Sequence, residues 1–409
     1  MKPKNYFAFK TKLDVPIVLD PSNFTPESRT PWGGFAIARL YKKHLQGSII
    51  NRVPEQIGES WEFSLDPSFP SKALLDGTPI SEIISRFPQE VFSEERLKRG
   101  LGHCHILVKL LEAKEPLSLQ VHPDDKDPDL KAHECGKPES WLVLHAQKGA
   151  GIYLGFKNPL TKGELKEILA REGDYAKNFL KFVPVEPGSY FEIKPGIPHA
   201  IGPGVVILEP QRVLPNREGK TFRLWDWGRL YQGKQRELHL AEGLKLIDPQ
   251  TQCGDFFVST LARRAEKTTH KVGEKTYEKF TYPANPEYQT TWIKGQDGIT
   301  LSCSVLMGFA VMTVIRGQVR ILKNSGERFE LSHAETILTE TTESSSGKDG
   351  TDPFLVKSGM TVLVPHALFP VKLEFIKSED SLSETPRLTE NHGEVECVFV
   401  IPTPSQLSI

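Results

Sequence analysis

Residues 116–125 (PLSLQVHPDD) combine an extended, apolar-rich pattern with polar side chains that could bind a ligand. Side chains alternate along a β-strand, which puts three polar ones on one face: Ser118, Gln120 and His122. The apolar side chains between them would face a core: Leu117, Leu119 and Val121. This pattern predicts a ligand-lined cavity, although a strand face whose polar groups are satisfied within the protein would look the same.

Two further segments carry groups that suit metal binding or acid–base chemistry. In residues 136–145 (GKPESWLVLH), alternation puts Lys137 and Glu139 on one face where an extended run begins. In residues 192–204 (EIKPGIPHAIGPG), prolines and a glycine form a tight turn that presents His199. Each has an ordinary structural alternative, because a Lys–Glu pair is usually a solvated ion pair and a lone histidine in a turn is usually structural.

Together the segments supply two histidines, a carboxylate and a neutral amide oxygen, from His122, His199, Glu139 and Gln120. Such a set suits zinc, manganese or iron with one exchangeable water position. Ligands from adjacent strands of a β-barrel can converge on its interior. The combination therefore predicts a metal centre inside a β-structure.

Residues 221–230 (TFRLWDWGRL) add two cations, Arg223 and Arg229, to an aromatic run. The alternating tryptophans indicate packing, and Arg229 could form a surface ion pair with Asp226. Arginine is nevertheless the residue type for bidentate contact with a phosphate or an oxyanion.

The elements that position these residues are short, since 32 glycines and 31 prolines interrupt the chain. Short β-branched runs bounded by turns indicate an all-β core of sandwich or barrel type. Helical patterns are confined to residues 80–99 and 161–182, and the second begins with a capping box of Thr161 and Glu164. Both are predicted to be helical insertions, the first within about residues 74–100.

The polar stretch at residues 247–254 predicts a boundary between two β modules, residues 1–248 and 249–409. A weak internal repeat supports two modules, because Pro–His–Ala occurs at His199 and again at His366. No Q-x-H or K-x-E pair accompanies His366. We therefore expect the second module to lack a metal and His366 to be structural.

Composition limits the class of partner. The 409 residues carry a formal net charge of −1, which argues against a nucleic-acid partner but allows a small anionic substrate. Five scattered cysteines without a C-x-x-C pair predict free thiols. The chain shows no secretory signal and no membrane-spanning run, so a cytoplasmic location is expected.

Five motifs within residues 32–248 resemble the class I mannose-6-phosphate isomerases (phosphomannose isomerases): WGG, LSLQVHPDD, GKPESW, PHAIG and FRLWDWGR. That family has the cupin fold and binds zinc. The resemblance implies cupin-type (jelly-roll) barrels, and zinc ligands at Gln120, His122, Glu139 and His199. General cupins place a glutamate a few residues after an H-x-H pair, whereas Glu139 lies seventeen residues beyond His122.

The resemblance also implies an active-site role for Arg223 and a sugar-phosphate pocket lined by Ser118, Lys137 and Arg229. Two departures from the family pattern stand out. The stretch between Glu209 and Arg223 is longer than in short bacterial members, and the turn before His199 carries its proline one residue later than is usual.

By this resemblance the chain is expected to interconvert mannose 6-phosphate and fructose 6-phosphate through a cis-enediol(ate), assisted by Zn²⁺. Lys137 and Glu209 are the candidate proton carriers, with Arg223 stabilising charge. Two alternatives remain open at this point. A metal-dependent cupin dioxygenase should have a histidine where Gln120 stands, and a sugar-phosphate-binding regulatory protein without turnover would not need Arg223.

Overall fold

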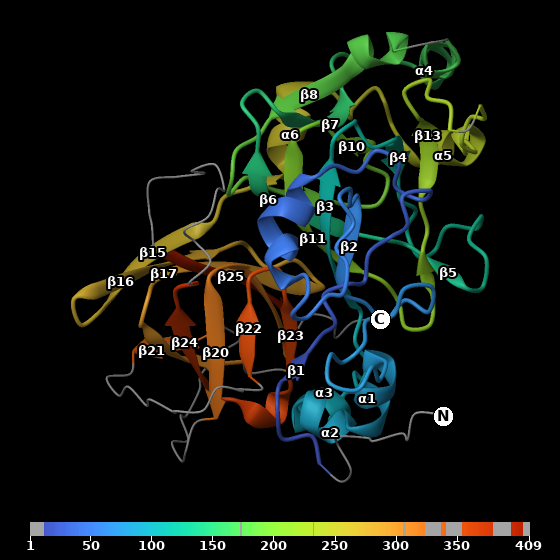
Figure 1. Ribbon diagram of the computed structural model, residues 1–409. Coiled ribbons are helices and arrows are strands. Elements are labelled where there is room, and N and C mark those ends of the chain that lie inside the picture. Colours follow the sequence, from blue (N-terminus) through green and yellow to red (C-terminus); the bar gives the residue numbers. More distant parts are fainter. Residues whose placement is uncertain are drawn as a thin grey trace.

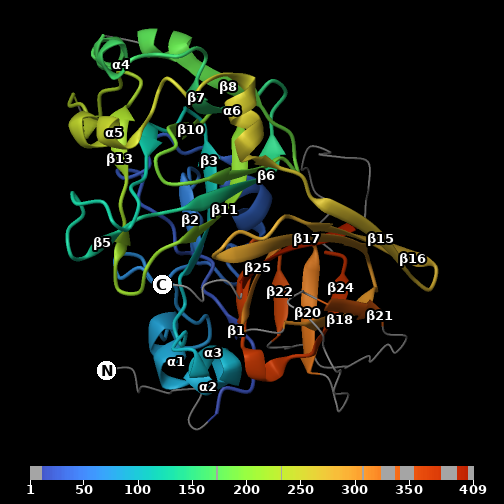
Figure 2. The same cartoon turned by 180° about the vertical axis from the view of Figure 1, so that it is seen from behind.

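The computed structural model describes residues 12–171, 174–231, 233–305, 308–323, 337–340, 354–378 and 394–403. Its strands form two double-sheet modules, one above the other in Figure 1 and seen from behind in Figure 2. The predicted mainly β class, with two β modules and helical insertions, is confirmed. Among the described residues, no helix has both the length and the apolar character needed to cross a bilayer.

The upper module is a sandwich of two sheets. One has six strands, in the order β14 (Ala262–Arg263), β9 (Tyr190–Ile193), β6 (Glu139–Ala146), β11 (Val205–Arg212), β3 (Ile106–Ala113), β2 (Glu59–Phe63). The other has five, in the order β13 (Phe222–Trp225), β4 (Leu119–Val121), β10 (His199–Ile201), β7 (Gly151–Phe156), β8 (Leu180–Pro184). Apolar side chains of both sheets meet between them, including Leu111, Val143, Ile152, Leu154 and Ile207. A short pair, β5 (Glu134–Cys135) and β12 (Glu218–Gly219), lies apart from both sheets.

The outer side of the five-stranded sheet is covered by α4 (Lys162–Leu169) and neighbouring helices. The predicted capping box is present, because Thr161 accepts the Glu164 N–H while the Glu164 carboxylate accepts from Thr161. The prediction that the helical region continues to residue 182 is wrong. A 3₁₀ turn, η3 (Tyr175–Phe179), is followed by β8, where Leu180 joins the core of the sheet.

Two helices of the upper module were not predicted, α5 (Leu240–Leu246) and α6 (Gly254–Leu261). α5 contains Gly243, a residue that is unfavourable inside a helix. A Cβ at Gly243 would lie 2.3 Å from Cδ2 of Leu224, so the glycine lets α5 lie against β13 without displacing that side chain. Tertiary packing therefore overrides local propensity here. α6 begins at Gly254, the last residue of the stretch that was predicted to be a boundary.

The helical insertion near residues 74–100 consists of three short helices, α1 (Ile80–Arg86), α2 (Pro88–Val91) and α3 (Glu94–Lys98). Pro88 starts a new helix because a proline inside a continuing helix would clash with the preceding turn. These helices pack on the lower module, where Phe92 meets Phe309 edge-on at 5.7 Å between ring centroids.

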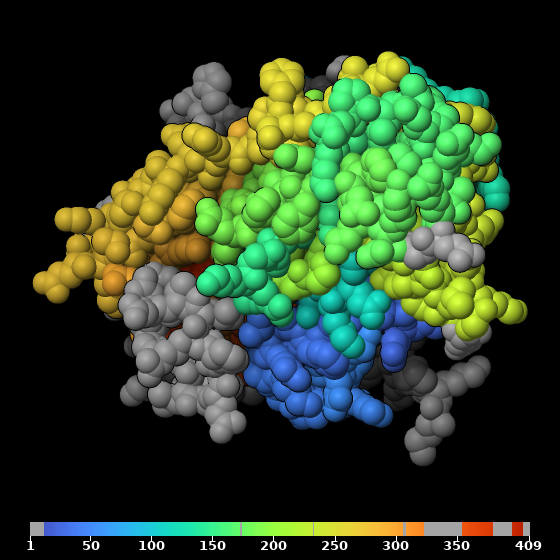
Figure 3. Space-filling view, turned by 90° about the horizontal axis from the view of Figure 1, so that it is seen from above, coloured from blue at the N-terminus to red at the C-terminus, as the bar shows by residue number. Residues whose placement is uncertain are grey.

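The lower module contains the other two sheets. The larger has seven strands, in the order β1 (Ile17–Val18), β23 (Thr361–Val364), β19 (Ala310–Arg316), β25 (Glu394–Pro402), β17 (Tyr288–Gln296), β16 (Lys275–Thr281), β15 (Glu266–Val272). The smaller has five, in the order β21 (Ile337–Glu340), β18 (Thr300–Ser304), β24 (Val371–Ile376), β20 (Gln318–Lys323), β22 (Leu355–Lys357). Seen from above, the gold β15–β16 hairpin projects from one side of the molecule (Figure 3).

The two modules exchange strands and share a core. β1, near the start of the chain, pairs with β23 of the lower module, and β14 pairs with β9 of the upper one. The η1 helix (Ile37–Lys42) adds a buried contact between modules, since Lys42 Nζ lies 2.6 Å from both Glu62 Oε1 and the Gly359 carbonyl oxygen. We propose that the division near residue 248 separates the two double sheets, except that β1 pairs with the lower module and that α6 and β14 pack on the upper one.

Candidate metal centre and cavity

Strand pairing brings four of the predicted site residues together between the sheets of the upper module. β10 pairs with β4 so that His199 lies opposite Gln120, and Glu139 begins β6 of the facing sheet. His122 follows the last residue of β4. The ligand atoms of His122, Glu139 and His199 lie within 4.8 Å of one another, and all three side chains are buried.

Each imidazole is oriented by a hydrogen bond on the side of the ring away from the carboxylate. His122 Nδ1 lies 3.0 Å from the Lys220 carbonyl oxygen, and His199 Nδ1 lies 2.7 Å from that of Ile197. Because a carbonyl oxygen only accepts, Nδ1 carries the proton in each ring and Nε2 keeps a lone pair. Both Nε2 atoms lie 3.3 Å from a Glu139 carboxylate oxygen.

This arrangement fits a divalent cation. A lone pair that faces a carboxylate oxygen is unfavourable unless a positive charge lies between them. His122 Nε2 and Glu139 Oε1 are buried without a hydrogen-bond partner in the protein. The Gln120 amide nitrogen lies 3.3 Å from His199 Nε2, so a half-turn of that amide would present its oxygen as a further donor. Two imidazoles, a carboxylate and an amide oxygen form a donor set for a transition-metal ion.

The protonation states of the cluster also suit a metal. Burial lowers the pKa of His122 to about 3 and holds the pKa of His199 below its ordinary value. Burial alone would raise the pKa of Glu139, but His122 and Lys137 outweigh it and hold that pKa well below its usual range. Neutral imidazoles and an ionised carboxylate are the forms that coordinate metals.

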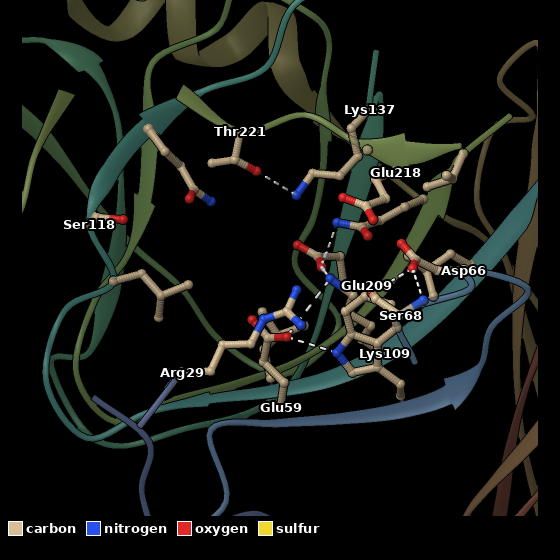
Figure 4. Close-up of a pocket in the computed structure, with 18 of the residues that line it drawn as sticks. Arg29, Glu59, Asp66, Ser68, Lys109, Ser118, Lys137, Glu209, Glu218 and Thr221 are labelled. Carbon is tan, nitrogen blue, oxygen red and sulfur yellow. Dashed lines mark hydrogen bonds and ion pairs between the residues drawn. The ribbon is translucent and has the colours of Figure 1, made fainter. Parts of the chain in front are cut away.

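A cavity of about 260 Å³ lies beside the cluster, and side chains of β2, β3 and β11 form part of its lining (Figure 4). Its cationic lining residues are Arg29, Lys109, Lys137, Arg223 and Arg236. Its carboxylates are Glu59, Asp66, Glu209 and Glu218. A small cavity whose lining carries both charges, beside a cluster that could bind a metal, suits a small hydroxylated anion.

Lys137 and Thr221 meet across one side of the cavity (Figure 4). Lys137 Nζ lies 3.1 Å from Thr221 Oγ1 and 3.8 Å from Glu139 Oε2. Burial lowers the pKa of Lys137, although the charge of Glu139 opposes this shift. The ordinary alternative of a solvated Lys–Glu pair is therefore wrong for these two residues, because both are buried.

Glu209 lines the cavity, and each of its carboxylate oxygens accepts a hydrogen bond. Its Oε1 accepts the Trp141 indole N–H at 2.9 Å, and its Oε2 accepts from Gln211 Nε2 at 2.7 Å. The same Gln211 nitrogen donates to Glu139 Oε2 at 2.7 Å. Burial, and then the charge of Glu139, raises the pKa of Glu209 to about 8. One amide thus couples the two buried carboxylates.

The arginines predicted for the site occupy different places. Arg223 lines the cavity and pairs across the ladder with Gln120, and its Nε lies 3.3 Å from Ser118 Oγ. Arg229 is not part of the cavity lining, and its Nη2 lies 2.5 Å from Asp226 Oδ1. Arg236, which was not predicted, does line the cavity and lies 3.7 Å from the other oxygen of Asp226.

The predicted alternation holds from Ser118 to His122 and fails at Leu117. Leu119 and Val121 face the helical cover, whereas Ser118 and Gln120 line the cavity. Leu117 also lines the cavity, which contradicts the prediction that it faces away. Leu117 stands two residues before the start of β4 at Leu119.

Other residues of the site were missed in the sequence: Lys109, Trp141, Gln211, Thr221 and Arg236. Gln211 had a usable signal, because it lies two residues after Glu209 on a strand and so shares its face. Lys109 also had one, as the charged residue in the apolar run 104–111, and Trp141 belongs to the GKPESW motif, whereas nothing distinguished Thr221 and Arg236 from packing or surface residues.

His366 of the lower module lies in the 3₁₀ turn η4 (His366–Leu368), and its Nδ1 is 3.2 Å from the Gly308 carbonyl oxygen. Within the described part of the chain, the cluster of His122, Glu139 and His199 is the one group of three or more such side chains with metal-binding geometry.

Comparison with known proteins points in one direction. Residues 28–153 match the family described as phosphomannose isomerase type I, catalytic domain. A mannose-6-phosphate isomerase of Streptococcus mutans is 27% identical over 326 residues, which cover 77% of this chain and 95% of that protein.

Solved structures share the fold. The crystal structure of mannose 6-phosphate isomerase from Bacillus subtilis superposes with a TM-score of 0.63 at 20% identity, covering 94% of this chain and 99% of the other. A mannose 6-phosphate isomerase bound with zinc and yttrium superposes with a TM-score of 0.58 at 13% identity, covering 94% and 98%. At such identities the likeness establishes a common fold.

Proposed function

We infer that this chain, which belongs to the type I phosphomannose isomerase family, interconverts mannose 6-phosphate and fructose 6-phosphate. The observation that carries this inference is the buried cluster of His122, Glu139 and His199 beside a small cavity of mixed charge. The substrate is then a small sugar phosphate, in agreement with the near-zero net charge of the chain.

We propose that the ion is zinc and that Gln120, His122, Glu139 and His199 hold it. Isomerisation changes no oxidation state, so a redox-inactive ion suffices. When bound, zinc would act as a Lewis acid toward the substrate oxygens, on which negative charge develops during isomerisation. The lone pairs of both Nε2 atoms and the ionised Glu139 support this assignment.

Proton transfer between C1 and C2 needs a base on one face of the cis-enediol(ate). Lys137 and Glu209 both line the cavity beside the cluster, and we propose that one of them carries this proton. Arg223, anchored on Ser118, would stabilise the negative charge that develops on the substrate oxygens. Gln211 orients Glu209 relative to Glu139, because its amide nitrogen donates one hydrogen bond to each carboxylate.

The phosphate would act as a remote handle whose binding energy orients the reacting carbons. Ser118 and Lys137 are candidates for holding it, together with an arginine. The sequence favoured Arg229, whereas Arg236 lies on the cavity and Arg229 lies behind it through Asp226. We therefore propose Arg236 as the arginine that contacts the phosphate and Arg229 as its support.

A coupled assay with mannose 6-phosphate, run with and without a chelator and joined to metal analysis, tests the proposal. We expect turnover, stoichiometric zinc, and loss of activity on chelation. His122→Ala should lose both zinc and activity, because the remaining donors cannot close the site. His366→Ala is the matched control and should keep zinc content and KM.

Several results would contradict this assignment. Normal zinc and turnover in His122→Ala would exclude the ligand set. Tight sugar-phosphate binding without turnover would favour a regulatory protein, and oxygen consumption with iron bound would favour a dioxygenase. A second zinc that His366→Ala removes would place a further metal site in the lower module.

A further inference from the structure

The six-stranded sheet that carries Glu139, Glu209 and Gln211 has a second face, which packs on the lower module. Side chains alternate along β6 and β11, so Ser140 and Pro210 lie on the face away from the cavity. Neighbouring apolar residues of that face, such as Leu142 and Leu208, share a core with residues of β17. The lower module is thus in contact with the back of the catalytic sheet.

The hydrogen-bonded ladder between β6 and β11 is interrupted behind the site. The strands pair up to Leu208 and Leu142 and again at Gln211 and Glu139, but no pair forms at Glu209 and Pro210. A proline has no N–H and cannot contribute a donor to a ladder. The ladder between β6 and β11 therefore lacks two consecutive pairs beside the buried carboxylates, although the register is the same on both sides of the gap.

Tyr288, the first residue of β17, fills this interruption from the lower module. Its hydroxyl oxygen lies 2.6 Å from the Pro210 carbonyl oxygen and 3.1 Å from Ser140 Oγ. The tyrosine O–H donates to the carbonyl, and the serine hydroxyl can donate to the phenol oxygen in return. The side chain is 2% exposed, so water does not compete for these contacts. One hydroxyl thus joins the two strands next to Glu139, Glu209 and Gln211.

The preceding residue, Glu287, makes a second link. Its Oε1 lies 3.5 Å from Nε of Arg212, the last residue of β11. The Arg212 guanidinium forms two bonds with Asp125, at 2.8 and 2.6 Å. Asp125 Oδ1 also accepts the Gly136 N–H at 2.9 Å. The loop after His122 and the loop before Lys137 are therefore held to one arginine, which the lower module contacts.

We propose that Tyr288, supported by Glu287, is a positioning residue for the metal centre. The lower module holds β6 and β11 at the separation that the ion and the Gln211 amide require. The effect of this positioning on kcat rests on the proposed isomerase function, whereas its effect on the affinity for the metal does not.

Tyr288→Phe and Tyr282→Phe form a matched pair of variants. Tyr282 lies at the same interface, is 1% exposed, and its hydroxyl donates to the Gly188 carbonyl oxygen at 3.1 Å. Each change removes one buried hydroxyl bonded to a backbone carbonyl, but only Tyr288 lies behind the site. The measurements are thermal unfolding, the affinity of the protein for Zn²⁺ in competition with a chelating dye, and kcat and KM for mannose 6-phosphate.

Both variants should lower the unfolding midpoint by similar amounts. Tyr288→Phe should weaken zinc binding by about 10-fold and lower kcat by about 10-fold, with KM within about 2-fold of wild type. Tyr282→Phe should leave zinc affinity and kcat within about 2-fold of wild type. Glu287→Gln should weaken zinc binding in the same direction as Tyr288→Phe, and it remains informative if Tyr288→Phe does not fold.

The inference is overturned if Tyr288→Phe and Glu287→Gln both bind zinc as wild type does. It is also overturned if Tyr282→Phe weakens zinc binding as much as Tyr288→Phe, because the effect would then reflect general loss of stability. An inactive wild type whose zinc affinity still separates the two tyrosine variants would refute the proposed function alone.

Discussion

The arginines near the cavity differ in the partners that their guanidinium groups bind within the protein. Arg223 is bonded to Ser118 and to the Glu237 carbonyl oxygen, and burial followed by the charge of Arg236 lowers its pKa. Arg229 is paired with Asp226 and with Glu115. Two guanidinium groups close enough to affect each other, Arg223 and Arg236, form a favourable place for an anion.

Arg223→Ala should lower kcat more than it raises KM, because the charge it stabilises develops only during proton transfer. A contact of this kind is worth about 3–4 kcal/mol, which corresponds to a loss of roughly 10²–10³ in kcat. Arg223→Lys should recover only part of the loss, since lysine offers a point charge in place of a planar fork. Arg236→Ala should raise KM with little change in kcat, and Arg229→Ala should have the smaller effect on KM.

Steady-state kinetics with zinc content checked on each variant decides between these roles. A wild-type kcat in zinc-loaded Arg223→Ala would end its catalytic assignment. A larger KM effect from Arg229→Ala than from Arg236→Ala would return the phosphate contact to Arg229.

At the scale of elements, the turn that leads into β10 holds both histidines. Gly196 lies in this turn with φ +81°, and its N–H donates to the His122 carbonyl oxygen at 2.8 Å. A Cβ at this position would lie 2.9 Å from the Leu246 carbonyl oxygen. The glycine is therefore required for its backbone conformation and for the close approach of α5.

Gly196→Ala should destabilise the fold by about 2 kcal/mol and weaken zinc binding, because the turn joins His199 to the backbone of His122. Gly273→Ala is the control, since Gly273 also has a positive φ (+61°) but a Cβ there meets nothing within 4 Å. The Gly273→Ala protein should be destabilised by about 1 kcal/mol through backbone strain alone, and its zinc affinity should be unchanged. Denaturant unfolding and zinc titration measure both effects, and equal zinc affinities in the two variants would exclude a role for the turn in the site.

At the scale of the whole molecule, a buried histidine outside the site should make the free energy of unfolding depend on pH. His105 is buried against His103, with ring centroids 4.4 Å apart, and its Nε2 has no hydrogen-bond partner. Burial, and then the charge of His103, lowers the pKa of His105 to about 3. In the unfolded chain its pKa is about 6.5, so below that pH the unfolded state binds more protons and stability falls.

His105→Phe should remove this dependence. Between pH 7.5 and pH 5 the wild type should lose roughly 2 kcal/mol more than the variant, from the protonation of His105 in the unfolded state. The measurement is the free energy of unfolding of both proteins across this range at constant zinc concentration. Parallel curves for the two proteins would show that His105 does not contribute.

The sequence by itself determined the type of structure and the segments that carry candidate ligands. Short β-branched runs between glycines and prolines indicated a mainly β chain because side-chain alternation and turn chemistry are local properties. Strand alternation pointed to Gln120, His122 and Glu139, and a tight turn pointed to His199, whereas the resemblance to a known family joined these residues into one set of metal ligands. Thr161 and Glu164 were predicted as a capping box from a spacing of three residues.

Only the tertiary structure decided what surrounds that group. The choice between Arg229 and Arg236 depends on which guanidinium the Asp226 loop turns toward the cavity, and no local pattern records it. Leu117 lines the cavity against the alternation of the residues that follow it, and it stands two residues before the start of β4. Tyr288 meets Pro210 from 78 residues away in the chain, and contacts so distant in sequence leave no periodic signal in either segment. Local sequence patterns thus identified the strands that carry the candidate ligands, whereas the contacts that hold these strands in place arise only when the two modules pack together.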